Sequence, residues 1–395
     1  MDPSNTTLTP HRAVLTGLAG LAAAMGIGRF AFTPLLPLMQ ADGLSLADGA
    51  WLAGANYLGY LLGAIACALL DPAPHRAARW GLLAVAVSTL AMAPVGDVAT
   101  ALVLRFAAGV ASAFVLIGIA AWALGWLAAQ GRSASSGGVF AGVGTGMVVA
   151  GLAAMAVALA GRSASTGWWV LGTIAAVVTA WSWRTLLRAA PAPRPGTGAA
   201  GAGGSPSLLL VACYGAFGFG YILPATFLPA MARGLVDDPA VFGWTWPVFG
   251  LAAALSTWLA GALFARMAPR TLWAGSQIVM AAGVLAGALW PASLGALMVG
   301  AVCVGRTFMV ATMAGMQEAR RVGGTGAARL MAAMTAAFGA GQLIGPLTIG
   351  AAGPHAQGLA LQSGVAAALL LVSSAALLWR RAAPSTTSHS STEHS

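Results

Sequence analysis

The sequence has 395 residues, of which 59% are hydrophobic and only 7% are charged. A soluble domain carries about 25% charged residues, so this composition excludes a water-soluble globular protein and predicts a chain that crosses a membrane several times. The net charge of +10 does not indicate nucleic-acid binding, because the chain has no lysine and its arginines fall mostly in short gaps between apolar runs.

Twelve apolar runs follow one another, each long enough to cross a bilayer as a helix. Six lie before residue 188, at 13–38, 48–70, 79–95, 98–123, 137–160 and 167–187, and six after residue 206, at 207–231, 240–264, 271–290, 293–316, 329–352 and 356–379. The runs lack strict alternation, which favours helices over barrel strands. The sequence therefore predicts an all-α polytopic membrane protein with twelve transmembrane helices.

The domain organisation follows from a Pro-, Gly- and Ala-rich tract at 188–206, which is predicted to be a cytoplasmic linker. It divides the chain into two six-helix bundles, residues 1–187 and 207–380, and a polar tail at 381–395 is predicted to be disordered. We expect the first run to be a retained helix, because cleavage of a signal peptide there would sever the segment at 26–37 from its helix.

The arginines also indicate the orientation of the chain. With the N-terminus inside, fourteen arginines lie in the cytoplasm and only Arg162 and Arg233 lie outside, as the positive-inside rule requires. Both termini are therefore expected to be cytoplasmic.

An internal repeat connects the two halves. The segment GIGRFAFTPLLP at 26–37 recurs as GFGYILPATFLP at 218–229, with two glycines and a proline at one constant offset, and Arg29 aligns with Tyr221. A second repeat relates three glycines of the fifth run to three of the eleventh: Gly142, Gly146 and Gly151 to Gly341, Gly345 and Gly350. Because each half has an even number of helices, the halves are parallel repeats, and a central cavity is expected between them.

Three arginines, Arg29, Arg105 and Arg306, lie inside the first, fourth and tenth runs. An arginine at the centre of a bilayer costs about 2.5 to 3.5 kcal/mol on insertion scales, and no aspartate or glutamate lies inside any run to compensate it. Since guanidinium is suited to carboxylate or phosphate, the arginines predict an anionic substrate. The alternative is that each arginine bonds backbone carbonyls freed near glycines and prolines.

Other polar and helix-breaking residues lie in the same runs. The polar candidates for substrate contact, which could equally bond between helices, are Asn56, Tyr57, Tyr60, Tyr221 and Gln342. Prolines inside apolar runs kink or unwind a helix and are candidates for gating or for exposing carbonyls: Pro34, Pro37, Pro224 and Pro229.

The sequence contains no signature of an enzyme. Three cysteines and five histidines are scattered along the chain, without a CxxC, HExxH, GxSxG or Walker pattern. We therefore expect neither an enzyme nor a bound metal or cofactor. Because no carboxylate or histidine lies inside a run, exchange, uniport or a proton carried with the substrate is expected.

Several segments resemble motifs of the major facilitator superfamily. In the fourth run, Arg105 and Gly109 are similar to its arginine-x-x-x-glycine motif. After the eighth run, GALFARMAPR at 261–270 is similar to its cytoplasmic loop motif, with Ala265 in place of the aspartate.

Two further segments carry the resemblance. Gly345 and Pro346 look like the glycine-proline motif of the superfamily and are the corresponding candidates for a helix break that serves gating. The opening GIGRFAFTPLLPLM at 26–39 resembles the YbfB/YjiJ-like branch of bacterial transporters.

The resemblance implies a cavity lined by the first, fourth, seventh and tenth helices, which carry Arg29, Arg105, Tyr221 and Arg306. It also implies a secondary transporter that works by alternating access. We expect a monomer in the bacterial inner membrane whose partners are lipid and a small anionic organic solute, with no nucleic acid. Efflux of neutral or amphipathic compounds is the alternative.

Overall fold

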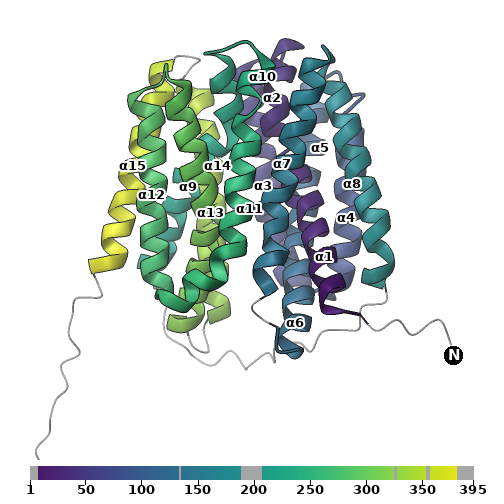
Figure 1. Ribbon diagram of the computed structural model, residues 1–395, viewed down its shortest axis with the longest axis vertical. Helices are drawn as coiled ribbons and strands as arrows, with labels where there is room; N and C mark the ends of the chain where they lie inside the picture. Colours follow the sequence, from purple (N-terminus) through teal and green to yellow (C-terminus); the bar gives the residue numbers. More distant parts are fainter. Residues whose placement is uncertain (1–7, 133–134, 188–206, 324–326, 353–355, 380–395) are drawn as a thin grey trace, which may run out of the picture.

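The computed structural model describes residues 8–132, 135–187, 207–323, 327–352 and 356–379, and these residues form helices without a strand among them. The long helices run side by side along the vertical axis of Figure 1. The predicted linker at 188–206 and the tail at 381–395 lie outside the described residues.

The first half begins with a span made of three pieces, α1 (Pro10–Leu21), the π-helix η1 (Ala22–Arg29) and α2 (Phe32–Ala41). The helices that follow are α3 (Leu46–Leu70), α4 (Pro74–Ala91), α5 (Val98–Ile119), the π-helix η2 (Ala120–Leu124), α6 (Gly125–Ala129), α7 (Ser136–Leu159) and α8 (Ala164–Leu187). Figure 1 shows these helices, purple to teal, on its right side.

The second half lies on the left of Figure 1, green to yellow. Its helices are α9 (Leu208–Arg233), the short α10 (Pro239–Phe242), α11 (Thr245–Arg266), α12 (Pro269–Leu289), α13 (Leu294–Gly323), α14 (Ala327–Ala352) and α15 (Ala356–Trp379).

The predicted membrane architecture is confirmed. Among the described residues, ten helical segments are long and apolar enough to cross a membrane. The two remaining predicted runs correspond to α4, whose first turns carry His75, Arg76 and Arg79, and to α14, in which Leu330–Gly345 is a shorter apolar helix. The all-α polytopic fold of the prediction is therefore the observed one.

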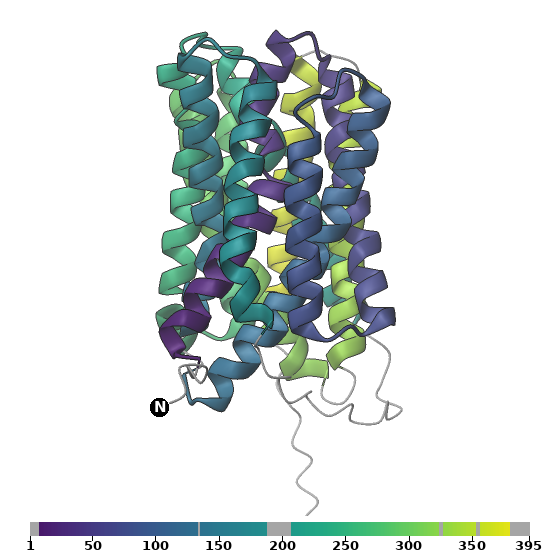
Figure 2. The same cartoon turned by 90° about the vertical axis from the view of Figure 1, so that its right-hand side faces the viewer.

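The first span is not a regular helix. In η1 the backbone bonds are of the wider π type, and the chain then turns through Phe30 and Ala31 before α2 begins. Figure 2 shows this span, purple, running from the end of the bundle near the N mark to the opposite end. A π segment within a helix is frequently found at a functional site, because it frees carbonyls and re-aims side chains.

The repeat glycines allow close helix packing in the first half. A Cβ on Gly26 would lie 2.3 Å from the Cα of Gly146, and a Cβ on Gly142 would lie 2.1 Å from the carbonyl oxygen of Leu18. The first span and α7 therefore approach each other backbone to backbone.

The equivalent contact occurs in the second half. A Cβ on Gly341 would lie 2.3 Å from the carbonyl oxygen of Gly215, and one on Gly218 would lie 2.4 Å from that of Phe338. The spacing found in the sequence thus corresponds to one packing geometry that is used twice, between α1 or η1 and α7 and between α9 and α14.

Gly26→Ala is expected to lower the free energy of unfolding by about 1–3 kcal/mol, because the added methyl group meets backbone that cannot rotate away. Thermal unfolding of the purified protein measures the loss. Gly364→Ala is the matched control, since a Cβ at this helical glycine meets nothing within 4 Å. An equal effect of the two substitutions would contradict the packing explanation.

Candidate substrate site

Arg29 is the last residue of η1 and is 2% exposed, between the two halves. Its Nη2 donates a hydrogen bond of 2.5 Å to the Oε1 of Gln342, which lies on α14. The guanidinium carbon is 3.9 Å from the ring centroid of Tyr60, 5.1 Å from that of Tyr57 and 5.5 Å from that of Phe30. Aromatic rings stabilise a cation by cation–π attraction, so these three rings hold the charge of Arg29 in a nearly dry environment.

The charge of Arg29 is not neutralised within the described part of the chain. Its Nε and Nη1 are buried without a hydrogen-bond partner there, and no carboxylate forms an ion pair with it. The buried carboxylate of the described chain, Glu318, is instead paired with Arg321 on α13, at 3.0 Å for both bonds. A buried cation with unused donors is costly unless an anion or a hydrogen-bond acceptor is supplied.

Gln342 connects Arg29 to Tyr221, the residue that aligns with Arg29 in the repeat. The Nε2 of Gln342 donates to the Tyr221 hydroxyl, while its Oε1 accepts from Arg29. The ring of Tyr221 is stacked between Phe308 and Phe338, with centroid distances of 5.6 and 5.5 Å. The two positions that the duplication relates therefore meet through one amide.

Further hydrogen bonds join the halves between Arg29 and the end of the bundle opposite Pro10. The Tyr57 hydroxyl lies 2.8 Å from the Oγ1 of Thr226, and the Oγ1 of Thr33 donates to the carbonyl of Ala225 at 3.0 Å. Nearer that end, Nη1 of Arg233 donates to the carbonyl of Pro37. The first span and α9 are thus joined on this side of Arg29.

Arg105 and Asn56 serve the backbone rather than an open site. The guanidinium of Arg105 donates to the carbonyl oxygens of Gly28 at 3.1 Å and Arg29 at 2.9 Å, and Nδ2 of Asn56 donates to the carbonyl of Arg105 at 2.9 Å. A Cβ on Gly109 would lie 2.1 Å from the Asn56 carbonyl, which explains the glycine four residues after the arginine. The alternative that an arginine bonds freed carbonyls therefore applies to Arg105, which supports the end of η1.

Arg105→Leu is expected to lower the free energy of unfolding by about 3 kcal/mol or more, since two hydrogen bonds from a charged group are lost at about 1.5–3 kcal/mol each. Amide hydrogen exchange at residues 22–31 is expected to become faster. Arg105→Lys keeps the charge but has a single donor nitrogen, so its stability and its exchange rate should lie between those of the wild type and Arg105→Leu. Unchanged exchange in Arg105→Leu would contradict this supporting role.

Arg306 does not lie with Arg29. Its side chain is exposed and lines a groove between α11, α12 and α13, whereas Phe308 on the same helix is buried against Tyr221. The prediction that three guanidinium groups share one central cavity is therefore wrong. The reason is helical geometry, because residues two positions apart point to nearly opposite sides of a helix.

The helix-breaking residues lie as follows. Pro37, Pro224 and Pro229 lie inside helices, and Pro34 lies in the first turn of α2, where a missing N–H costs little. Gly345 is buried, with the side chain of Ile222 2.5 Å from a Cβ placed on it. The backbone of Pro346 belongs to α14, while its side chain lies outside what the structure describes.

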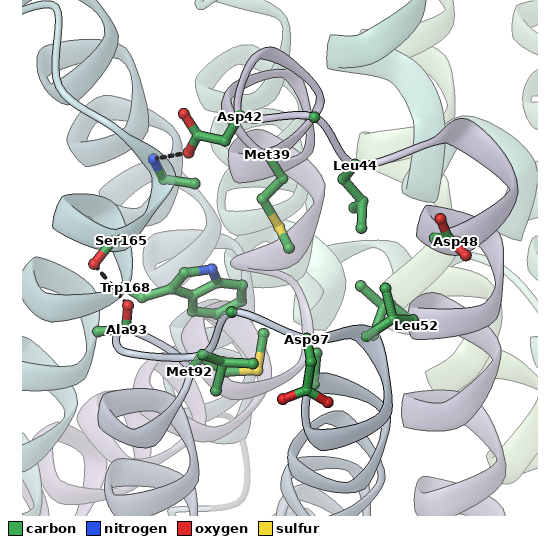
Figure 3. Close-up of a pocket in the computed structure, with 16 residues that line it drawn as sticks. Met39, Asp42, Leu44, Asp48, Leu52, Met92, Ala93, Asp97, Ser165 and Trp168 are labelled. Carbon is green, nitrogen blue, oxygen red and sulfur yellow. Dashed lines mark hydrogen bonds between the residues drawn. The ribbon is translucent and has the colours of Figure 1, made fainter.

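A cavity with a volume of about 340 Å³ lies within the first half, at the end of the bundle opposite Pro10 (Figure 3). Its lining includes Trp168 and three aspartates, Asp42, Asp48 and Asp97. Each aspartate accepts a hydrogen bond: Asp42 from the backbone N–H of Ala164 at 2.8 Å, Asp48 from Ser45 at 2.6 Å and Asp97 from the N–H of Thr100 at 2.8 Å.

The aspartates of this cavity have a structural use. Asp97 caps the N-terminus of α5, and the backbone hydrogen bond from Thr100 lowers the pKa of its carboxyl group. Asp42 ties the end of the first span to the start of α8. The acidic residues thus stabilise this end of the first half.

Tyr57 and Tyr60, two of the three rings around Arg29, are among the polar candidates of the apolar runs, and they share a helix face because they lie three residues apart. Nothing in the sequence singles out Phe30 as part of the site. Phe30 packs on Arg29 only because the chain turns at the end of η1, and no sequence pattern indicates that turn.

The duplicated six-helix halves, the broken first span and a buried polar contact between them define the class of secondary carriers. Residues 21–378 match the family described as "Uncharacterised MFS-type transporter YbfB". The chain belongs to this family of the major facilitator superfamily, which is a family of transporters and not of enzymes. A search of curated proteins finds no match.

Proposed function

We propose that this transporter moves a small organic anion across the bacterial inner membrane by alternating access, with Arg29 as the residue that binds the anionic group. The observation that carries the proposal is the buried guanidinium of Arg29, which has two unused donors and no carboxylate partner in the described chain. An anion that reached Arg29 would supply both the missing charge and the missing acceptors.

The geometry of the hydrogen bond to Gln342 suggests how binding is coupled to movement. A carboxylate binds guanidinium most strongly through two adjacent donors, and every adjacent pair on arginine, Nε with Nη2 or Nη1 with Nη2, includes Nη2. Nη2 has one N–H on each of these two edges, and Gln342 accepts one of them, so a carboxylate that binds by the edge that Gln342 occupies has to displace that amide. Gln342 then acts as a placeholder for the substrate in the empty carrier.

Displacement of Gln342 removes a bond between the halves, since Arg29 belongs to the first half and Gln342 to the second. In the proposed cycle the bodies 1–187 and 207–380 then rock about the site, linked by 188–206, and the hydroxyls of Tyr57 and Tyr221 contribute polar contacts. The kinked segments at Pro34, Pro37, Pro224, Pro229, Gly345 and Pro346 are the proposed places of bending. We propose a monomer with both termini in the cytoplasm.

A thermal-shift screen on the purified protein tests the assignment. Millimolar organic acids are compared with their own neutral amides and alcohols, and a carboxylate is expected to raise the unfolding temperature while its neutral analogues do not. If the neutral analogues stabilise the protein equally, the anionic substrate is rejected and efflux of neutral amphipathic compounds is favoured.

A further inference from the structure

Arg306 presents a charge to the hydrocarbon layer, away from the contact between the halves. It lies roughly 18 Å along α13 from Leu294 and roughly 25 Å from Gly323, at 1.5 Å per residue. Its side chain is exposed, and within the described residues it makes no hydrogen bond and no ion pair. A guanidinium at this depth needs a counter-charge that the described part of the chain does not supply.

The surroundings of Arg306 form a groove with a volume of about 780 Å³ between α11, α12 and α13, which pack against one another. The three helices are labelled on the left of Figure 1. The groove is mainly apolar, and its α11 side is formed by Leu251, Leu255 and Leu259, each more than half exposed. Its volume is in the range of sites for small molecules.

A few polar groups accompany the arginine. Each helix contributes one hydroxyl to the lining, Ser256 from α11, Ser276 from α12 and Thr307 from α13. Arg266, the last residue of α11, is a second arginine in the lining. An apolar groove with Arg306, Arg266 and a few hydroxyl groups is suited to a ligand with an anionic head and an apolar body.

We propose that this groove binds a fatty-acid-like carboxylate that enters from the bilayer. The carboxylate pairs with Arg306, and the hydrocarbon chain covers the exposed leucines of α11. The site is separate from Arg29 and does not depend on what the transporter carries.

The depth of the arginine favours a free carboxylate over a phospholipid. The head group of a phospholipid stays at the edge of a hydrocarbon layer about 30 Å thick, whereas Arg306 lies near the middle of its apolar run. A single-chain carboxylate can be neutralised by Arg306 and so place its charged end deeper in the layer. The paired charges also remove the reason for the bilayer to thin around α13.

The test is equilibrium binding of radiolabelled palmitic acid to the full-length protein in phosphatidylcholine nanodiscs. Saturable binding is expected for the wild type, at least tenfold weaker binding for Arg306→Gln, and at least tenfold weaker binding of hexadecanol to the wild type. Leu255→Trp fills the groove but leaves the arginine in place, so it is expected to weaken palmitic acid binding to the same extent by steric exclusion. This variant keeps the test valid if Arg306→Gln does not fold. Arg29→Gln is expected to bind palmitic acid as the wild type does.

Three results would overturn the proposal. Equal palmitic acid binding by wild type, Arg306→Gln and Leu255→Trp would show that the groove is not the site. Equal binding of hexadecanol would remove the role of the charge. Displacement of palmitic acid by phosphatidylglycerol added to the nanodiscs would assign the groove to bilayer lipid instead.

Discussion

Arg29→Gln is expected to abolish transport of any carboxylate that stabilises the wild-type protein. Hydrogen bonds to charged groups contribute about 1.5–3 kcal/mol each, so the loss of two corresponds to about 3 kcal/mol or more, which is a fall in affinity of about 100-fold or greater. Counterflow of the radiolabelled carboxylate in proteoliposomes measures the effect.

Two further variants make the result on Arg29 specific. Arg29→Lys keeps the charge but offers a point charge in place of a planar pair of donors, so it should retain a small part of the activity. Arg162→Gln removes an exposed arginine in the loop between α7 and α8 and should transport as the wild type does. Transport that survives in a folded Arg29→Gln protein would exclude Arg29 from the substrate site.

Gln342→Ala is expected to tighten binding of the same carboxylate by roughly tenfold and to slow its transport by a similar factor. Binding tightens because Nη2 of Arg29 no longer has to lose a hydrogen bond of about 1.5–3 kcal/mol before the carboxylate binds. Transport slows because the empty carrier loses the hydrogen bond from Arg29 to Gln342, which gives Arg29 an acceptor while the two halves are in contact. Affinity is measured by calorimetry and turnover by counterflow.

Thr33→Val is the matched control for Gln342→Ala. It also removes a hydrogen bond between the halves, from Thr33 to the carbonyl of Ala225, but leaves the partner of Arg29 in place. It should leave the affinity nearly unchanged. If Gln342→Ala weakens binding as strongly as Arg29→Gln does, Gln342 is a direct ligand of the substrate and not its placeholder.

The membrane fold could be predicted from the sequence because its signals are local. Each apolar run needed only its own length and composition to be recognised, although α4 is less apolar than most because its first turns carry His75, Arg76 and Arg79. The repeat added a relation between distant residues, since it paired Arg29 with Tyr221, which one amide connects in the structure.

The site was less predictable because depth in a membrane does not determine direction. Arg29, Arg105 and Arg306 lie at similar depths in their runs, but depth alone does not determine on which side of its helix each side chain lies. The π-helix η1 has no sequence signature either. Its presence determines that Arg105 bonds two carbonyls while Arg29 faces the partner half.

The absence of an acidic partner for Arg29 within the described chain has an electrical consequence under the proposed function. With a monoanion bound to Arg29, the substrate site would carry almost no net charge during the conformational change. In the vacant carrier, the same change would move a net positive charge. Membrane voltage acts on such a charge with about 2.3 kcal/mol per 100 mV if it traverses the whole field. Membrane voltage would therefore act on the step in which the vacant carrier returns. Exchange of one anion for another avoids this step, so exchange would be the faster mode of transport.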